Sequence, residues 1–210
     1  MSTPTPTPSS GGAARTASAT RTTKETDISV SVNIDGTGAG SRSTGLPFFD
    51  HMLDQLARHG GFDLVVDAVG DLDVDGHHTV EDCAILLGEC FAAALGDKTG
   101  VRRFASGSYP LDEALVEVAL DLSGRPFAAI DLPFGEVLAL GSPPFNPEMA
   151  VHFMSSFATS ASITLHVTKR AGENTHHVVE AAFKGLARCL RDAVRVEGDQ
   201  VPSTKGTLSA

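Results

Sequence analysis

The sequence predicts an α+β fold of two internally duplicated units, each with the order strand-helix-strand-strand-helix. Apolar residues alternate in some stretches and recur every three or four positions in others, which indicates strands and helices respectively. The motif His-His-x-x-Glu occurs twice, at residues 77–81 and 176–180, which indicates the duplication. The apolar share of 41% is sufficient for a continuous core. We therefore expect one domain in which two mixed β-sheets enclose the helices.

The first half of this domain is expected at residues 24–97. The stretch from Ile28 to Ile34 alternates apolar and polar residues, which is typical of a strand with one buried face. Pro47 near the start and a Gly pair past the end delimit the next helix. The expected elements are a strand at 26–34, a helix at 47–58, strands at 62–69 and 71–74, and a helix at 78–95.

The second half is expected at residues 98–196. Its first alternating stretch follows Glu113, just as the strand at 26–34 follows Glu25, and Asn174 is a suitable N-cap for its last helix. The expected elements are strands at 115–122 and 127–132, a helix at 147–161, a strand at 163–167 and a helix at 175–194, followed by a C-terminal segment at 197–210.

Residues 1–23 form a Thr-, Pro-, Ser- and Ala-rich stretch that is expected to be a disordered tail. Such a composition buries too little apolar surface to offset the entropy lost on ordering. Because the stretch contains Arg and no acidic residue, a transit segment is the alternative interpretation.

Charge and composition exclude several function classes. A formal net charge of −10 argues against nucleic acid as a partner. The chain lacks the continuous apolar run that a membrane-spanning helix needs. Its three Cys residues form no CxxC pair and have aliphatic neighbours, so we expect buried free thiols and a reducing, cytoplasmic location.

Six of the eight His residues fall at equivalent places in the two halves, and each His pair precedes a Glu. Residues four apart lie on one face of a helix, so His77 and Glu81 can share a metal ion. His176 and Glu180 of the second motif can share one in the same way. Adjacent residues point about 100° apart on a helix, so each adjacent His is expected to serve a different ion. The six are His51, His77, His78, His152, His176 and His177.

This ligand set predicts at least two metal positions built from duplicated half-sites. Imidazole and carboxylate ligands without thiolates suit Mn²⁺, Fe²⁺, Co²⁺, Ni²⁺ or Zn²⁺ rather than Ca²⁺. A single His-His-x-x-Glu motif is compatible with a polar helix start that binds nothing, but two copies with matched upstream His residues favour metal binding. His59 and His166 lie outside the pattern and are expected to be structural.

Five stretches resemble the imidazoleglycerol-phosphate dehydratase family of histidine biosynthesis. They are GLPFFDHML at 45–53, DGHHTVED at 75–82, DLSGRP at 121–126, HHVVEA at 176–181 and PSTKG at 202–206. The resemblance extends from about residue 21 to residue 206, which is nearly the whole chain outside the tail.

This resemblance implies a hydro-lyase that converts D-erythro-imidazole glycerol phosphate into imidazole acetol phosphate and water. It also implies two Mn²⁺ ions per active site and a 24-subunit assembly with active sites at the subunit interfaces. The implied metal ligands are His51, His77, His78, Glu81, His152, His176, His177 and Glu180. The implied substrate-binding residues are Gln55, Arg103, Arg125, Lys184, Ser203 and Lys205, the last two from the C-terminal segment.

The chemistry of the implied reaction accounts for these residue types. Metal ions on the imidazole ring act as Lewis acids that stabilise an imidazolate when the adjacent, weakly acidic C–H loses its proton. Loss of the neighbouring hydroxyl then passes through a diazafulvene-like intermediate, and tautomerisation gives the ketone. Glu25 is the candidate acid/base, with Glu180 or a metal-bound water as its counterpart. Arginine, lysine and serine side chains would hold the phosphate.

Two other functions stay open on the residues alone. The same His and Glu pairs could activate water in a dimetal hydrolase that acts on a phosphate ester. They could also store metal, or stabilise the fold, without any turnover.

Overall fold

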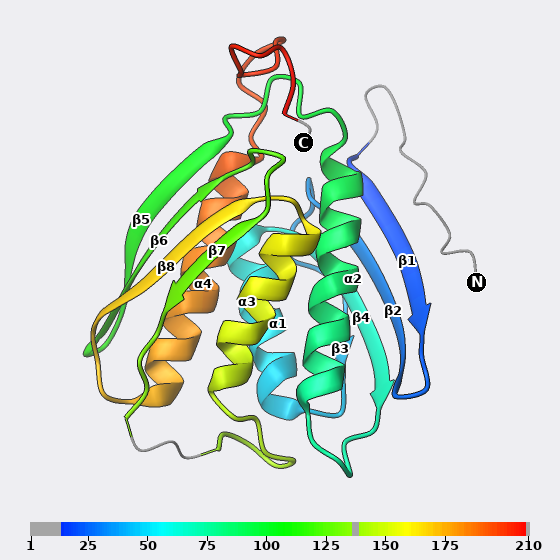
Figure 1. The fold of residues 1–210 in the computed structure, drawn as a ribbon, viewed down its shortest axis with the longest axis vertical. Coiled ribbons are helices and arrows are strands. Elements are labelled where there is room, and N and C mark those ends of the chain that lie inside the picture. The colour runs from blue at the N-terminus through cyan, green and yellow to red at the C-terminus, as the bar shows by residue number, and fades with distance from the viewer. Residues whose placement is uncertain (1–13, 136–138, 209–210) are drawn as a thin grey trace.

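Two four-stranded β-sheets form the outer layers of the fold, and the helices lie between them (Figure 1). A computed structural model describes residues 14–135 and 139–208. The predicted α+β class, with two mixed sheets around the helices, is confirmed. Within the described residues the elements are β1 (Thr16–Thr22), β2 (Thr26–Asn33), β3 (Arg42–Ser43), α1 (Pro47–Gly60), β4 (Asp63–Gly70), α2 (His77–Leu95), β5 (Phe104–Leu111), β6 (Ala114–Asp121), β7 (Phe127–Asp131), α3 (Glu148–Ser160), β8 (Thr164–Ala171) and α4 (Thr175–Ala193).

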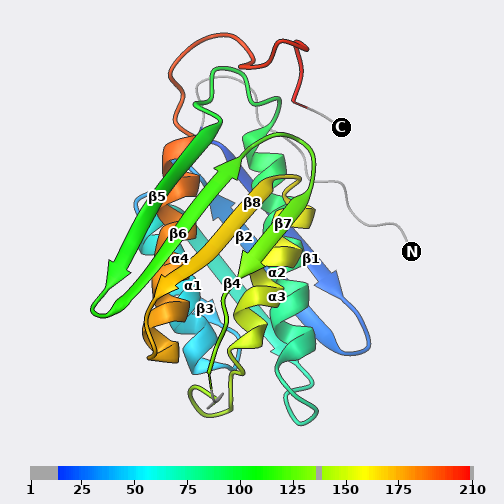
Figure 2. The same cartoon turned by 60° about the vertical axis from the view of Figure 1, so that its left-hand side comes forward.

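The two sheets have the same topology, which reflects the internal duplication (Figure 2). The first sheet has the strand order β1-β2-β4-β3 and the second has the order β5-β6-β8-β7. In each sheet the last pair is parallel and the other pairs are antiparallel. Each half therefore runs strand-strand-strand-helix-strand-helix, which corrects the predicted order of strand-helix-strand-strand-helix.

Residues 16–22, which were predicted to belong to a disordered tail, form strand β1. All of β1 pairs with β2, from Thr16 opposite Asn33 to Thr22 opposite Asp27. Its inward side chains include the small, buried Ala17, so the sequence carries no strong apolar alternation here. Hydrogen bonds to β2 and the strand preference of Thr stabilise the strand instead. Residues 1–13 of the predicted tail lie outside the described residues.

The stretch at 71–74, predicted as a strand, is a turn. The backbone N–H of Val74 donates to the carbonyl of Asp71 at 2.8 Å, and Val74 is 70% exposed. Two apolar residues between aspartates resemble a strand pattern, but an Asp-rich stretch also favours turns. Strand β5 was not predicted because it contains Gly107 and Pro110, which sheets tolerate mainly at edges such as this one.

Each half packs its helices against those of the other half. Helix α1 packs on α4, and helix α2 packs on α3. Phenylalanine rings join all the helices: the Phe153 ring lies 5.5 Å from that of Phe49 and 5.1 Å from that of Phe183, and the Phe157 ring lies 5.7 Å from that of Phe91. These rings are buried, so the helix layer is the core of the domain.

The three Cys residues are buried free thiols, as predicted. Burial raises the pKa of Cys83, of Cys189 and of Cys90, the last to about 11, which makes these thiols poor nucleophiles. None of the described helices combines the length and the apolar character needed to cross a membrane.

Replacing Gly88 by alanine tests the tight packing of α2 on α3. A Cβ at Gly88 would meet the Phe157 carbonyl oxygen at 2.8 Å and the Ala161 backbone nitrogen at 2.9 Å. Overpacking of this kind lowers the free energy of unfolding by roughly 1–3 kcal/mol, and the better helix propensity of alanine offsets this by about 1 kcal/mol at most. We expect Gly88→Ala to lower Tm in thermal unfolding by several degrees. Gly198→Ala is the control, because an added methyl there meets open space, and an equal Tm for both variants would contradict the prediction.

Candidate active site

Three potential metal ligands converge at the junction of α1 and α4. They are His51, His176 and Glu180, here called the His51 cluster, and their ligand atoms all lie within 4.8 Å of one another. Both Nε2 atoms approach the same carboxylate oxygen of Glu180, at 3.2 Å from His51 and 3.0 Å from His176. Imidazole nitrogens and a carboxylate oxygen that converge on one point are a suitable ligand set for a divalent transition metal.

Glu180 is ionised at neutral pH. Burial raises the pKa of this carboxyl, but hydrogen bonds from Lys184, His176 and His51 outweigh that effect and lower it to about 2. The Lys184 ammonium lies 2.6 Å from Glu180 Oε1. Further along α1, Gln55 Nε2 lies 3.4 Å from His51 Nδ1, and His59 in turn lies 3.2 Å from Gln55. Gln55 and Lys184 therefore both flank the His51 cluster.

A second cluster forms at the junction of α2 and α3. It consists of His77, Glu81 and His152, here called the His77 cluster. The His152 Nε2 atom lies 3.2 Å from Glu81 Oε1, and the rings of His77 and His152 are 4.4 Å apart. That Nε2 atom is buried and makes no hydrogen bond within the described residues. A buried imidazole nitrogen that makes no hydrogen bond is costly, and a metal ion bound between it and the Glu81 carboxylate would satisfy it.

The two clusters are related by the internal duplication, and each combines residues from both halves of the chain. The His51 cluster takes one His from the first half and a His/Glu pair from the second, whereas the His77 cluster does the reverse. Side-chain hydrogen bonds hold both pairs at their helix starts. Asn174, the N-cap of α4, accepts from the backbone N–H groups of His176 and His177. The Asp75 carboxylate, just before the N-cap Gly76 of α2, accepts from that of His77.

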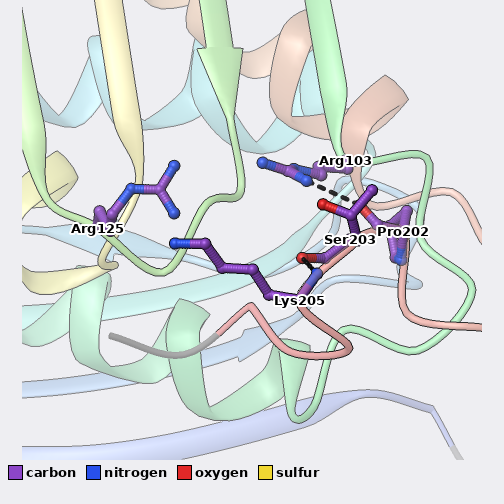
Figure 3. A pocket seen from close by; sticks show the side chains of 6 residues that line it. Arg103, Arg125, Pro202, Ser203 and Lys205 are labelled. Carbon is purple, nitrogen blue, oxygen red and sulfur yellow. Dashed lines mark hydrogen bonds between the residues drawn. The ribbon is translucent and has the colours of Figure 1, made fainter.

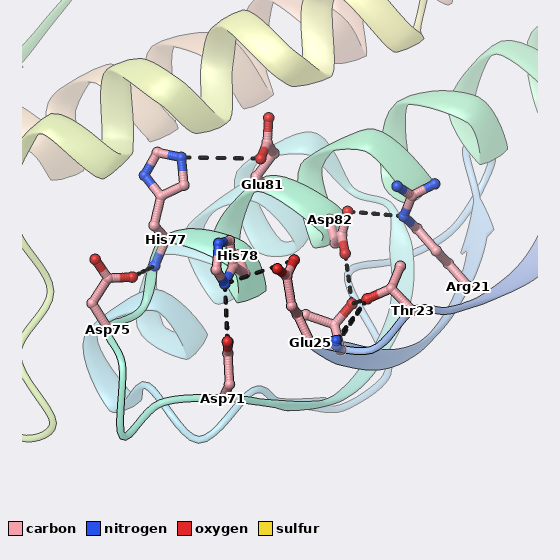
Figure 4. Close-up of polar contacts among 10 residues, drawn as sticks. Arg21, Thr23, Glu25, Asp71, Asp75, His77, His78, Glu81 and Asp82 are labelled. Atoms are coloured by element: carbon pink, nitrogen blue, oxygen red, sulfur yellow. Dashed lines mark hydrogen bonds and ion pairs between the residues drawn. The ribbon is translucent and has the colours of Figure 1, made fainter.

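His78 and His177 lie outside both clusters and contact other carboxylates. His78 Nδ1 lies 3.0 Å from Asp71 and 3.8 Å from Glu25 (Figure 4). His177 Nδ1 lies 2.7 Å from Glu113. The hydrogen bond that His78 donates to Asp71 raises the pKa of His78, and the one that His177 donates to Glu113 raises that of His177. The same bond from His177 lowers the pKa of Glu113 to about 2. A carboxylate at Nδ1 orients the ring so that Nε2 is the nitrogen offered to a metal.

A hollow of about 490 Å³ at the far end of the molecule is lined by cationic side chains (Figure 3). Arg103, Arg125, Ser203 and Lys205 line it. Asp121 holds the Arg103 guanidinium through two hydrogen bonds of 2.7 and 3.0 Å and raises its pKa, and Arg103 Nη1 also donates to the Pro202 carbonyl. Several cations beside a hydroxyl group form a suitable site for a phosphate.

The segment that supplies Ser203 and Lys205 is tied back to the domain. The Lys98 ammonium is buried and donates to the Leu208 carbonyl at 3.2 Å, and the Gly100 backbone N–H donates to the Gln200 carbonyl at 2.9 Å. Burial lowers the pKa of Lys98. These anchors give the phosphate-binding candidates a fixed backbone.

The clusters and the cationic hollow lie at opposite ends of the helix layer (Figure 1). Helix α4 has 19 residues, a length of about 28 Å, and it carries His176 at its first turn while its last turn leads into the segment with Ser203. Within one chain, therefore, Arg103, Arg125, Ser203 and Lys205 do not meet the metal-ligand candidates, whereas Gln55 and Lys184 do.

Comparison with known proteins identifies the family. The family model for imidazoleglycerol-phosphate dehydratase matches residues 44–190. The chain belongs to this family. A relative from Carboxydothermus hydrogenoformans, named imidazoleglycerol-phosphate dehydratase, is 54% identical over 168 residues, which are 80% of this chain and 86% of the relative. One from Acidothermus cellulolyticus with the same name is 54% identical over 166 residues, or 79% of each chain.

Solved structures of imidazoleglycerol-phosphate dehydratases have the same fold. The crystal structure from Staphylococcus aureus is 30% identical with a TM-score of 0.76, and it covers 85% of this chain and 97% of its own. The one from Pyrococcus furiosus is 38% identical with a TM-score of 0.75, and it covers 90% of this chain and 99% of its own.

In this family member, several side chains around the site were not predicted from the sequence. The contact of Glu113 with His177 was predictable, since Glu113 precedes its strand just as Glu25 does. Asp71, which contacts His78, was not identified because the sequence predicted a strand at 71–74. Asp121 was noted only as part of a motif, and its hold on Arg103 needs the fold. His166 is exposed on the outer face of β8 beside Phe127, away from both clusters.

Proposed function

We propose that this chain dehydrates D-erythro-imidazole glycerol phosphate to imidazole acetol phosphate, a step of histidine biosynthesis, with Mn²⁺ as the cofactor. The observation that carries the proposal is the pairing of two ligand clusters with a separate cationic hollow, because the substrate has an imidazole at one end and a phosphate at the other. Membership of the imidazoleglycerol-phosphate dehydratase family supports the same reaction.

The ligand clusters suit two Mn²⁺ ions per active site. The His51 and His77 clusters each offer two imidazoles and one carboxylate, and His78 and His177 add one further imidazole per ion. When bound, the metal supplies Lewis acidity to the imidazole ring of the substrate.

Glu25 is the group that we assign to proton transfer. Its carboxylate is exposed and lies 3.8 Å from His78, so a substrate imidazole held near the metal ligands comes within its reach. Removal of the carbon proton and departure of the neighbouring hydroxyl would proceed through a diazafulvene-like intermediate and end in the ketone. Glu180, the other candidate, has a pKa of about 2 and three hydrogen-bonding partners, which favours the role of metal ligand over that of base.

We infer that the active site is completed between subunits. A single substrate is far shorter than the length of about 28 Å that separates the two ends of α4. The cationic hollow of one subunit must therefore meet the clusters of another, where Gln55 and Lys184 also contact the substrate. The 24-subunit assembly implied by the family resemblance satisfies this requirement, and the three buried free thiols are compatible with a cytoplasmic location.

Turnover of the Mn²⁺-loaded protein with imidazole glycerol phosphate tests the proposed reaction. We expect an enolisable ketone product and no inorganic phosphate, with activity lost after chelation and restored by Mn²⁺. Release of inorganic phosphate would identify a hydrolase instead, and the absence of both products would indicate metal storage.

Lys205→Met tests the phosphate contact. The Lys205 ammonium makes no hydrogen bond within the described residues, so the substitution should leave the fold intact. Loss of a charged hydrogen bond should raise KM by about ten- to hundredfold and change kcat little. Lys169→Met, on β8 and away from the hollow, is the control, and a KM for Lys205→Met equal to that of the control would contradict the assignment.

Chelation tests whether metals join the subunits. If His78 and His177 ligate ions shared with a neighbouring subunit, EDTA should reduce the particle size in size-exclusion chromatography, and Mn²⁺ should restore it. His177→Ala should weaken the assembly in the same way, because the neighbouring imidazole of His176 already belongs to the His51 cluster. An unchanged elution profile after metal removal would exclude metal bridging.

A further inference from the structure

A buried carboxylate ties the turn that carries Glu25 to the helix that carries the His77 cluster. We propose that Asp82 is a positioning residue that acts through Thr26 and Thr23 to hold Glu25 beside His78, an inference that rests on the proposed function. Asp82 follows the cluster residue Glu81 in sequence and lies on the side of α2 that faces β1 and β2 (Figure 4).

Both oxygens of Asp82 are used. Asp82 Oδ1 accepts from Arg21 Nε at 2.8 Å, and Asp82 Oδ2 accepts from the Thr26 hydroxyl at 2.5 Å. Asp82 is 7% exposed and Thr26 is 4% exposed, so their hydrogen bond is shielded from competing water. Two strands, β1 and β2, are thereby joined to one helix through a single carboxylate.

The network continues from Thr26 to the backbone of Glu25. The Thr23 hydroxyl oxygen lies 3.1 Å from that of Thr26 and accepts the backbone N–H groups of Glu25 at 3.1 Å and of Thr26 at 3.0 Å. The Glu25 carbonyl accepts the Asp71 backbone N–H at 3.1 Å. The backbone of Glu25 is thus fixed on both sides, while its side chain stays exposed toward His78.

Rigid placement of this kind matters for proton transfer. A base must come within hydrogen-bonding reach of the proton that it removes, and a displacement of about 1 Å can reduce a rate by up to about a hundredfold. Because α2 also carries His77, His78 and Glu81, the contact with Asp82 fixes Glu25 relative to the residues that would hold the substrate imidazole.

The duplicated half provides an internal comparison. In the second half, apolar Ala181 and Ala114 stand where Asp82 and Thr26 stand in the first, and Tyr109 replaces Arg21. Both alanines are buried, and the Tyr109 hydroxyl contacts Cys189 Sγ at 3.1 Å.

The β5–β6 hairpin therefore packs on α4 without any buried carboxylate at this place. The fold itself does not require a polar anchor here, and buried ion pairs are weak contributors to stability. Glu25 and Glu113 are both exposed, but Glu113 bonds His177 directly at 2.7 Å. In the half with the anchor, Glu25 lies 3.8 Å from His78, which bonds Asp71 instead.

Thr26→Val and Thr26→Ser form the test pair. Valine keeps the shape and the strand preference but cannot donate to Asp82, whereas serine keeps the hydroxyl. We expect Thr26→Val to lower kcat by roughly ten- to hundredfold with KM within about threefold, and Thr26→Ser to stay within about twofold of the wild type. In a Glu25→Gln background, Thr26→Val should cause no further loss, because the network acts through Glu25. Asp82→Asn is the second variant if Thr26→Val does not fold.

Hydrogen exchange of the metal-free protein provides a readout that does not depend on turnover. Thr26→Val should accelerate exchange of the Glu25 and Thr26 amides and leave the amides of α4 unchanged. Tyr109→Phe is the matched control from the second half, and it should change neither kcat nor exchange at residues 23–26.

Any of three results would overturn the inference. The first is an unchanged kcat in Thr26→Val. The second is a fall in kcat on adding Thr26→Val to Glu25→Gln that is as large as the fall in the wild-type background. The third is unchanged amide exchange at residues 23–26. Failure of the proposed function is distinguishable, since the wild-type protein would then not dehydrate imidazole glycerol phosphate. In that case the exchange measurement still decides whether Asp82 holds the turn.

Discussion

The packing of helices from one half against helices from the other is the constraint on which both ligand clusters depend. Helix α1 supplies one imidazole to a His/Glu pair on α4, and α3 supplies one to the pair on α2. The buried phenylalanine rings between the helices set these distances. A shift of one helix would separate an imidazole from its carboxylate, so the geometry of both ligand clusters depends on the aromatic core.

Electrostatics prepares the same region for cations. Glu180 is kept ionised by Lys184 and two imidazoles, and the imidazoles of His78 and His177 are each oriented by a carboxylate at Nδ1. At the opposite end, Asp121 holds the Arg103 guanidinium in place. Glu180 and Arg103 are therefore each positioned by an opposite charge, as are His78 and His177, which reduces the reorganisation needed when a ligand binds.

Much of this fold and site could be predicted from the sequence, because the strongest signals are periodic or repeated. Helices α1, α2, α3 and α4 were predicted within a few residues of their observed bounds, and the duplicated His-His-x-x-Glu motif indicated two related ligand sets. Strand β1 was missed since its pairing with β2, rather than its apolar content, stabilises it.

The exchange of ligands between halves could not be predicted, because a sequence pattern within one helix carries no information about which helix packs on it. The same limit applies to the separation of the cationic hollow from the clusters. The roles of Asp82 and Asp121 could not be predicted for a related reason. The partner of Asp82 is Thr26, which is distant in sequence, and the partner of Asp121 is Arg103, which meets it only across a sheet.

The cross-half construction of the clusters has a consequence for which residues each half can carry. In a twofold-symmetric dimer, residue i of one copy meets residue j of the other, and the reverse contact occurs as well. The His51 and His77 clusters have this reciprocal relation inside one polypeptide. Two identical half-length chains would necessarily carry the same residue at every equivalent position. In a single chain that restriction is absent, so a buried Asp82 can face a threonine in one half while Ala181 occupies the equivalent place in the other.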